Sequence, residues 1–266
     1  MLFRSSLNIA ATGMAAQQLN TEVIANNIAN LNTTGFKRQR ADFHDLLYQD
    51  RGVTVGSRTS DSGSVVSSGT QTSVGVKIGG TYRINSQGAL TGTENNLDIA
   101  INGRGFLVVN LPNGVTGYTR AGSLQISPTG EIVTAQGYSV RPGLTLPANT
   151  KQISITDQGL IQATIDGQVV PVDVGRFEMA VFPNDAGLAN IGNSYLAATP
   201  ASGNPTTGNP GEIGFGTVKQ GFLEASNVDM VSEITALISA QRAYEMNSKV
   251  IQASDDMLHT TTQSMR

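Results

Sequence analysis

Apolar residues recur with a helical period at both ends of the chain. From Phe3 to Leu31 the positions are spaced alternately four and three residues apart, which is the a/d pattern of a coiled-coil seam. The C-terminal segment repeats the pattern from Met230 to Met265, and Ser226-Asn227-Val228-Asp229 has the form of a capping box that starts it. Polar residues interrupt both stripes. The pattern predicts a long helix at each end.

Glycine and proline mark the middle of the chain as different. All nine prolines and 28 of the 30 glycines lie between Phe36 and Gly221, and both residues favour turns over helices. Short apolar stretches bounded by turn residues, such as Phe106–Asn110 and Leu160–Ile165, predict antiparallel strands, with Asn113-Gly114 as a hairpin turn. We therefore expect an α+β fold: paired, coiled-coil-like N- and C-terminal helices with a central antiparallel β domain.

These patterns also predict a division into domains. Residues 1–45 and 222–266 should form a terminal helical assembly domain, and 81–221 the central β domain. Between them, residues 46–80 read as a Gly/Ser/Thr-rich linker, because 16 of the 24 residues from Gly52 to Gly75 are of these three types. Such a composition favours an extended or flexible chain.

The C-terminal helix is too long to cover its own apolar stripe against a compact domain. At 1.5 Å per residue it would extend on the order of 55 Å, so it needs a partner helix, for which the N-terminal segment is the obvious choice. Because the seams are interrupted, an isolated pair should be marginal in water. We expect both ends to be poorly ordered in a monomer and to fold on association; an intramolecular helical hairpin is the alternative.

Composition excludes several classes of function. A net charge of −3 with 14% charged residues gives no electrostatic footprint for nucleic acid or an anionic membrane, and no apolar run is long enough to span a bilayer. The absence of cysteine rules out disulfides, thiol nucleophiles and iron–sulfur clusters. With His44 and His259 as the only histidines, we expect no metal site and no cofactor. No cleaved signal peptide is expected either, because polar residues break the first apolar stretch.

The sequence offers little catalytic chemistry. Gly103-Arg104-Gly105 is half of a dinucleotide-binding loop without the third glycine or a following helix, which favours a tight turn into a strand. His44 stands near Asp42 and Asp45, but in an amphipathic stretch whose charged residues should face water. The adjacent carboxylates of Asp255 and Asp256 diverge by about 100° on a helix. We expect no enzymatic activity.

Three groups of motifs resemble one protein family. Ala25-Asn26-Asn27-Ile28-Ala29-Asn30 with Thr34-Gly35-Phe36-Lys37 resembles the N-terminal signature of bacterial flagellar axial proteins, the rod and hook subunits. Ser226-Asn227-Val228-Asp229, with the stretch from Gln241 to Lys249, resembles their C-terminal signature. Gly103–Phe106 and Tyr118–Gly122 resemble their shared β domain. Phe36–Arg40 and Asp45–Gln49 are most similar to subunits of the distal rod.

The resemblance implies a structural protein of the flagellar basal body. Its terminal helices would pack with those of other copies into a helical, hollow drive shaft that crosses the periplasm and transmits torque to the hook. Expected partners are further copies of the chain, proximal rod proteins, the hook protein, the surrounding periplasmic and outer-membrane rings, and the flagellar export apparatus; nucleic acid and direct membrane insertion are not expected. A proximal rod subunit and, from another class, a secreted β-rich adhesin remain as alternatives.

The expected assembly interface follows the helical stripes and the signature motifs. Polar seam residues can fix helix register, so we hypothesise that Asn26, Asn27 and Asn30 form inter-helix hydrogen bonds, with simple exposure and helix termination as the alternative. The complete set of predicted interface residues is Leu7, Met14, Ile24, Asn26, Asn27, Ile28, Asn30, Ile234, Leu237, Gln241, Arg242, Tyr244, Ile251 and Leu258.

Overall fold

The computed structural model describes residues 2–46, 48–50, 71–167 and 170–264. The chain divides into two compact units, and each is described by itself. Unit 1 contains Met1–Asn26, Arg40–Thr81 and Val231–Arg266, and unit 2 contains Asn27–Gln39 and Tyr82–Met230. Most of the predicted Gly/Ser/Thr-rich linker falls on 51–70, which lie outside the described residues.

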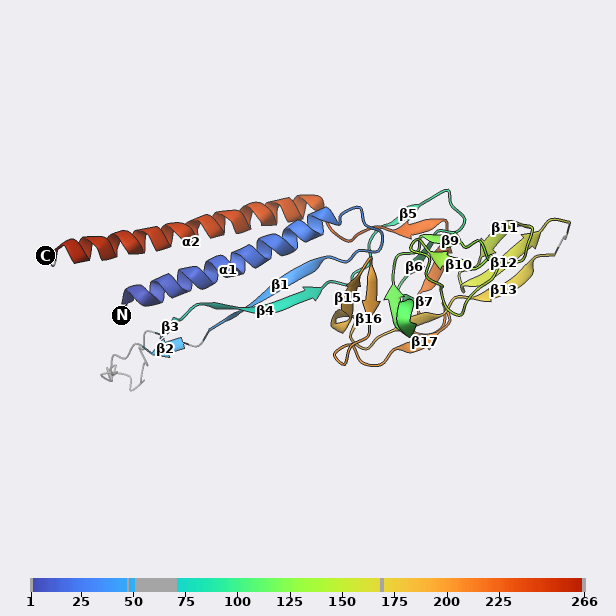
Figure 1. Cartoon of the computed structure of the whole chain (residues 1–266), viewed down its shortest axis with the longest axis horizontal. Helices are drawn as coiled ribbons and strands as arrows, with labels where there is room; N and C mark the ends of the chain where they lie inside the picture. Colours follow the sequence, from blue (N-terminus) through green and yellow to red (C-terminus); the bar gives the residue numbers. More distant parts are fainter. Residues whose placement is uncertain (1, 47, 51–70, 168–169, 265–266) are drawn as a thin grey trace, which may run out of the picture. The chain divides into compact units, whose positions relative to one another are not determined.

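Two α-helices occupy the ends of the chain (Figure 1). Helix α1 runs over Leu2–Ala29 and helix α2 over Met230–Ser264. α1 ends in a tightened turn, in which the Asn30 and Leu31 amides donate to the carbonyls three residues earlier, both at 3.2 Å. The chain then reaches Gly35 in the left-handed region at φ +68°, a conformation that stops a helix and suits glycine.

Unit 1 also contains strands. β1 (Gln39–Asp45) and β4 (Val76–Arg83) form a two-stranded sheet, and β2 (Tyr48–Asp50) pairs antiparallel with β3 (Gln71–Ser73). The Val76 amide donates to the Thr12 hydroxyl of α1 at 3.3 Å, which attaches β4 to the first helix. Helical and β structure are therefore combined in one unit.

The largest sheet of unit 2 has six strands in the order β15-β16-β8-β7-β14-β17, with every neighbouring pair antiparallel. A short 3-10 helix, Pro112–Gly114, joins β7 to β8, at the hairpin turn that Asn113-Gly114 predicts. The six strands are β7 (Phe106–Asn110), β8 (Thr116–Thr119), β14 (Met179–Val181), β15 (Ala189–Gly192), β16 (Tyr195–Ala197) and β17 (Thr206–Gly208).

Smaller antiparallel sheets complete unit 2. Gly122 follows β8, and a Cβ there would overlap the carbonyl oxygen of Ile99, so only glycine lets these two backbones approach. The sheets are β5 (Leu90–Gly92) with β19 (Phe222–Glu224), β6 (Ile99–Asn102) with β18 (Thr217–Gln220), β9 (Leu124–Ile126) with β10 (Ile132–Thr134), and the triple β11 (Thr150–Ile155), β12 (Leu160–Ile165) and β13 (Val172–Arg176).

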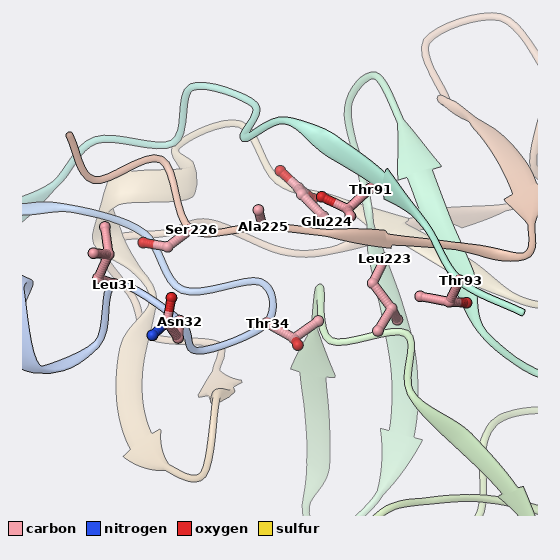
Figure 2. Close-up of a pocket in the computed structure, with 9 residues that line it drawn as sticks. All are labelled: Leu31, Asn32, Thr34, Thr91, Thr93, Leu223, Glu224, Ala225 and Ser226. Carbon is pink, nitrogen blue, oxygen red and sulfur yellow. The ribbon is translucent and has the colours of Figure 1, made fainter. Parts of the chain in front are cut away.

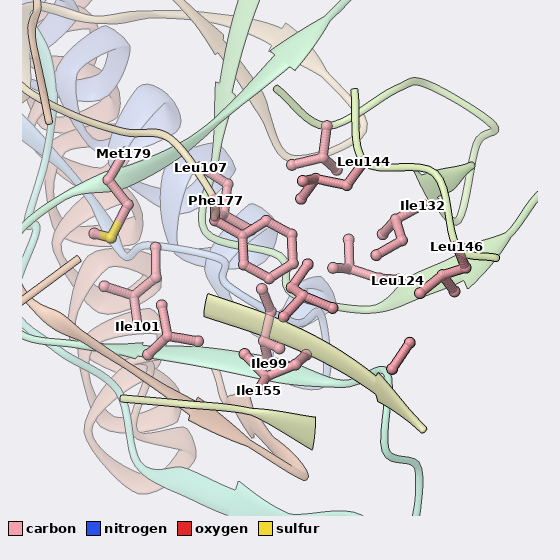
Figure 3. Packing of buried hydrophobic residues seen from close by; sticks show 14 residues of the cluster. Ile99, Ile101, Leu107, Leu124, Ile132, Leu144, Leu146, Ile155, Phe177 and Met179 are labelled. Carbon is pink, nitrogen blue, oxygen red and sulfur yellow. The ribbon is translucent and has the colours of Figure 1, made fainter. Parts of the chain in front are cut away.

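Strand β7 lies between two hydrophobic clusters of unit 2. Leu107 packs in the larger cluster, around Phe177, which is fully buried (Figure 3). Phe106 and Val108, on the opposite face of the strand, belong to the second cluster with Phe182. Because side chains alternate between the faces of a strand, a strand buried on both faces is a continuous apolar run, as Phe106–Val109 is in the sequence.

The predicted fold class is wrong. Two helices and a β-rich centre are present, but the helices do not form a coiled-coil-like pair beside a single β domain, because most of β1 and of β4 belongs to the helical unit. Where interlocking side chains would fill a seam, a groove of about 330 Å³ lies between α1 and α2, lined by residues that include Thr21 and Gln241. Periodicity reveals that a stripe exists; it does not show what covers it.

We predict that Phe177→Ala lowers the free energy of unfolding of unit 2 by about 3–5 kcal/mol, through lost apolar burial and the cavity left behind. The measurement is urea unfolding of the full chain. Val115→Ala removes an exposed side chain and should change the value by no more than about 0.5 kcal/mol. Equal effects of the two substitutions would contradict the position of the core.

Candidate assembly surface and its buried ion cluster

Small residues form the inner face of the helices in unit 1. Ala10 and Ala16 are buried on α1, and Ala240 and Ser254 are buried on α2. Gly13 faces Asn247 of α2, because a Cβ at Gly13 would lie 2.9 Å from the Asn247 amide nitrogen. α1 and α2 therefore approach each other through small and polar side chains here.

The predicted interface residues of unit 1 fall in different environments. Ile24 of α1 is buried, and Leu7 and Met14 are half-buried. On α2 the buried positions 233, 240 and 254 each precede a member of the predicted stripe by one residue, so the buried face is rotated by about 100°. Leu237 and Ile251 are half-buried, and the exposed members are Ile234, Gln241, Arg242, Tyr244 and Leu258.

Large apolar side chains of α2 lie on its exposed side. Val231 is 73% exposed, Met246 61% and Ile238 45%. The groove between the helices is lined by Gln18, Thr21 and Glu22 of α1 and by Gln241, Tyr244 and Glu245 of α2. Exposed apolar residues in such number on one helix are characteristic of a surface that binds another protein.

A buried ion cluster stands in unit 2, formed by Lys37, Arg120 and Glu224. Their side chains are only 4%, 8% and 0% exposed. The Lys37 ammonium donates to one carboxylate oxygen of Glu224, and Arg120 donates to the other at 3.1 Å. Lys37 follows α1 in the chain and Glu224 precedes α2, so the cluster links the segments from which both helices continue.

Further hydrogen bonds satisfy the buried charges. Lys37 also donates to the Ser86 carbonyl at 2.8 Å, and Arg120 to the Gly103 carbonyl at 2.7 Å. The Gly88 amide donates to the Glu224 carboxylate at 3.0 Å. Burial lowers the pKa of Lys37 from its ordinary value, and the positive charge of Arg120 lowers it further. The hydrogen bond to Glu224 and the negative charge of Glu224 act in the opposite direction and raise it. Desolvation outweighs pairing, so the ammonium depends on Glu224.

Backbone contacts surround the cluster. The Gly35 amide donates to the Glu224 carbonyl at 2.8 Å, and the Arg38 amide to the Asn227 side chain at 2.7 Å. Asn227 in turn donates to the Ile84 carbonyl at 2.9 Å. A Cβ at Gly35 would lie 2.8 Å from the Ala121 amide nitrogen. The motifs Thr34–Lys37 and Ser226–Asp229, distant in sequence, thus meet on one framework.

The three asparagines predicted to fix register differ in their surroundings. Asn27 is buried and bonds the backbone of Gln39 twice, donating to its carbonyl at 2.8 Å and accepting from its amide at 2.9 Å. Asn30 accepts from the Thr33 hydroxyl at 3.1 Å, and Asn26 is exposed. Ile28 is half-buried. Asn27 therefore holds the chain that follows α1, within unit 2.

A pocket of about 220 Å³ lies beside the ion cluster (Figure 2). The Thr93 hydroxyl on its wall is buried and has no hydrogen-bond partner among the residues that the structure describes. Among the lining residues, Glu224 is the one ionisable group, and its carboxylate is already bonded to Lys37 and Arg120. The lining residues are Leu31, Asn32, Thr34, Thr91, Thr93, Leu223, Glu224, Ala225 and Ser226.

Sequence reasoning missed the cluster. Lys37 and Arg120 lie within recognised motifs, but neither was predicted to form an ion pair, and Glu224 lies outside every motif. The available signal was that Glu224 is the single acid between Glu212 and Asp229, in a segment that forms strands β18 and β19. Periodicity cannot detect an ion pair between residues 187 positions apart.

The described part of the chain holds no group of three or more histidine, aspartate or glutamate side chains that could bind a metal ion. His44 lies 3.8 Å from Asp42, with both side chains more than half exposed. Among the same residues, no helix combines the length and apolar character that crossing a membrane requires.

Comparison with known proteins identifies the family. Three family descriptions match: Flagella basal body rod protein over 7–37, Flagellar hook protein FlgE/F/G D1 domain over 100–163, and Flagellar basal body rod FlgEFG protein C-terminal over 219–264. The chain is 54% identical to flagellar basal-body rod protein FlgG of Caulobacter vibrioides, over 97% of this chain and 98% of the relative. The chain belongs to the flagellar basal-body rod protein family.

Other rod proteins of this family are similarly related. The FlgG protein of Agrobacterium fabrum is 45% identical, over 98% of this chain and 99% of the relative. The FlgG protein of Bacillus subtilis is 36% identical, over 95% of this chain and 96% of the relative. The three matched segments of the rod family contain one cluster member each, Lys37, Arg120 and Glu224 respectively. As a member of the rod family, the chain is a structural subunit of the flagellar basal body.

We predict that Glu224→Gln destabilises unit 2 by about 3–5 kcal/mol, because it leaves two buried cations without their counter-ion. Urea unfolding at pH 7 measures this loss. Asp166→Asn removes the acid of an exposed ion pair with Lys151 at 3.9 Å, and should cost no more than about 1 kcal/mol. Similar losses of unfolding free energy in the two variants would show that the buried cluster stabilises unit 2 no more than an exposed ion pair does.

The asparagine signature provides a second matched pair. Asn27→Ala should destabilise unit 2 by about 1–3 kcal/mol, because two backbone groups of Gln39 lose their partner. Asn26→Ala, one residue earlier at an exposed position, should cost clearly less. Thermal unfolding of both variants gives the comparison; an equal or larger loss for Asn26→Ala would contradict the assignment of Asn27 as the anchoring residue.

Proposed function

We propose that the chain polymerises helically into the distal part of the rod, a hollow drive shaft that transmits torque to the hook. Rod-family membership establishes the structural role, and the similarity to proteins named FlgG supports the distal position. The observation that carries the polymer is the exposed apolar side of α2, with Val231, Ile238 and Met246. A helix that exposes these residues in a single chain gains stability when further copies cover them.

The ion cluster contributes to this function through stiffness. A shaft transmits torque only if each of its subunits resists deformation. Lys37, Arg120 and Glu224 fix the segments that follow α1 and precede α2 by direct bonds inside unit 2. Because leaving any one charge unpaired is costly, the cluster opposes gradual separation of these segments.

Partners and location follow from the resemblance to rod and hook proteins. We infer that the rod contacts proximal rod proteins below, the hook protein above and the ring proteins around it, and that it crosses the periplasm after passing through the flagellar export apparatus. Terminal helices that become ordered only on association would suit such passage. A proximal rod subunit would have the same architecture and different neighbours.

Ile238→Asp tests the polymer. We expect it to raise the concentration needed for assembly at least tenfold, because a charge would be buried against a neighbouring copy, while the unfolding of unit 2 stays unchanged. Sedimentation and electron microscopy over a concentration series measure assembly. Val115→Asp alters an equally exposed residue of unit 2 and should assemble normally. Filaments of Ile238→Asp at the wild-type concentration would contradict the proposal.

A further inference from the structure

The groove between α1 and α2 carries negative charge. Its two ionisable carboxylates come one from each helix, Glu22 from α1 and Glu245 from α2, and the aromatic ring of Tyr244 lies on its wall. The Gln18 side chain donates to Glu22 at 3.2 Å. We call this feature, lined by Gln18, Thr21, Glu22, Gln241, Tyr244 and Glu245, the acidic groove.

A second feature of α2 has the opposite charge. Arg242, Met246 and Lys249 are all exposed and stand at intervals of four and three residues. At 100° per residue they fall within a sector of about 60°. We call them the basic ridge. The groove-lining residues of α2 are centred about 110° around the helix from this ridge on the same geometry.

Neither ridge cation forms an ion pair with a described residue, although Glu245 stands three residues after Arg242 and four before Lys249 on the same helix. Among the residues that the structure describes, no acid lies within 4.0 Å of the charged nitrogens of Arg242 or Lys249. Two cations and an exposed methionine side by side form a surface that suits an acidic, partly aromatic partner. Arg can stack on an aromatic ring, and methionine sulfur makes favourable contacts with aromatic edges.

We propose that the basic ridge of one copy docks into the acidic groove of a second copy. The inference rests on the proposed homopolymer and names the surfaces that join its subunits. Opposite charges supply the complementarity, with Glu22 and Glu245 facing Arg242 and Lys249, and Tyr244 contacts Met246. The centres of the ridge and the groove lie about 110° apart around α2, so a copy whose groove is filled still presents its ridge to the next copy. Such a heterologous contact repeats without closing on itself and gives a filament.

Charge reversal tests this pairing. Arg242→Glu/Lys249→Glu and Glu22→Lys/Glu245→Lys should each raise the concentration needed for assembly at least tenfold. An equimolar mixture of the two variants should assemble within about threefold of wild type, because each altered surface then meets its opposite charge. Lys151→Glu/Lys219→Glu changes the net charge as Arg242→Glu/Lys249→Glu does, but on exposed residues of unit 2, and should assemble normally. Sedimentation at low and at high salt measures all four samples.

The outcomes separate the contact from the function. A mixture that assembles no better than its components would overturn the ridge–groove contact, and so would normal assembly of either variant alone; both leave the rod subunit intact. Failure of the wild-type chain to polymerise would count against the proposed function instead.

Cross-linking decides the contact even without polymers. The chain contains no cysteine, so Gln18→Cys and Lys249→Cys can be introduced in separate chains, mixed and oxidised. We expect disulfide heterodimers well above the statistical share. Products at or below that share would overturn the contact.

Discussion

Glu224 is the charge on which the arrangement of unit 2 depends. Its carboxylate accepts from Lys37, Arg120 and the Gly88 amide, and its carbonyl accepts from Gly35. A fully buried carboxylate is tolerated only when such bonds replace its hydration. The donors come from the segment after α1, from Arg120 directly after strand β8 and from Gly88 before strand β5, so the fold must bring all of them to one point.

The helices of unit 1 differ from unit 2 in how completely their apolar side chains are buried. Their inner face uses small residues such as Ala10 and Ala240, while Val231 and Met246 of α2 remain exposed. Apolar burial is thus incomplete in the single chain, whereas unit 2 has filled clusters around Phe177 and Phe182. This contrast fits a subunit whose centre folds on its own and whose helices are completed by neighbouring copies, as expected of a flagellar rod component.

Several local features could be predicted because they depend on near neighbours in the sequence. The stop of α1 before Gly35, the turn before Phe106 and the hairpin at Asn113-Gly114 are set by backbone preferences of a few residues. The most buried positions of α2 could not be read from its apolar stripe, since Ala240 and Ser254 carry little hydrophobic signal although they are buried. The ion cluster could not be predicted for another reason, which is that its members are far apart in the chain.

The sequence by itself determined the helical ends, the β-rich centre and, through its motifs, the protein family. These rest on helical periodicity, on the positions of glycine and proline, and on short signature motifs within the sequence. Only the tertiary structure decided that β1 and β4 join the helical unit, that Lys37, Arg120 and Glu224 meet, and that a groove separates α1 from α2. Burial and long-range pairing depend on which surfaces meet in space, and the order of residues along the chain does not encode that locally.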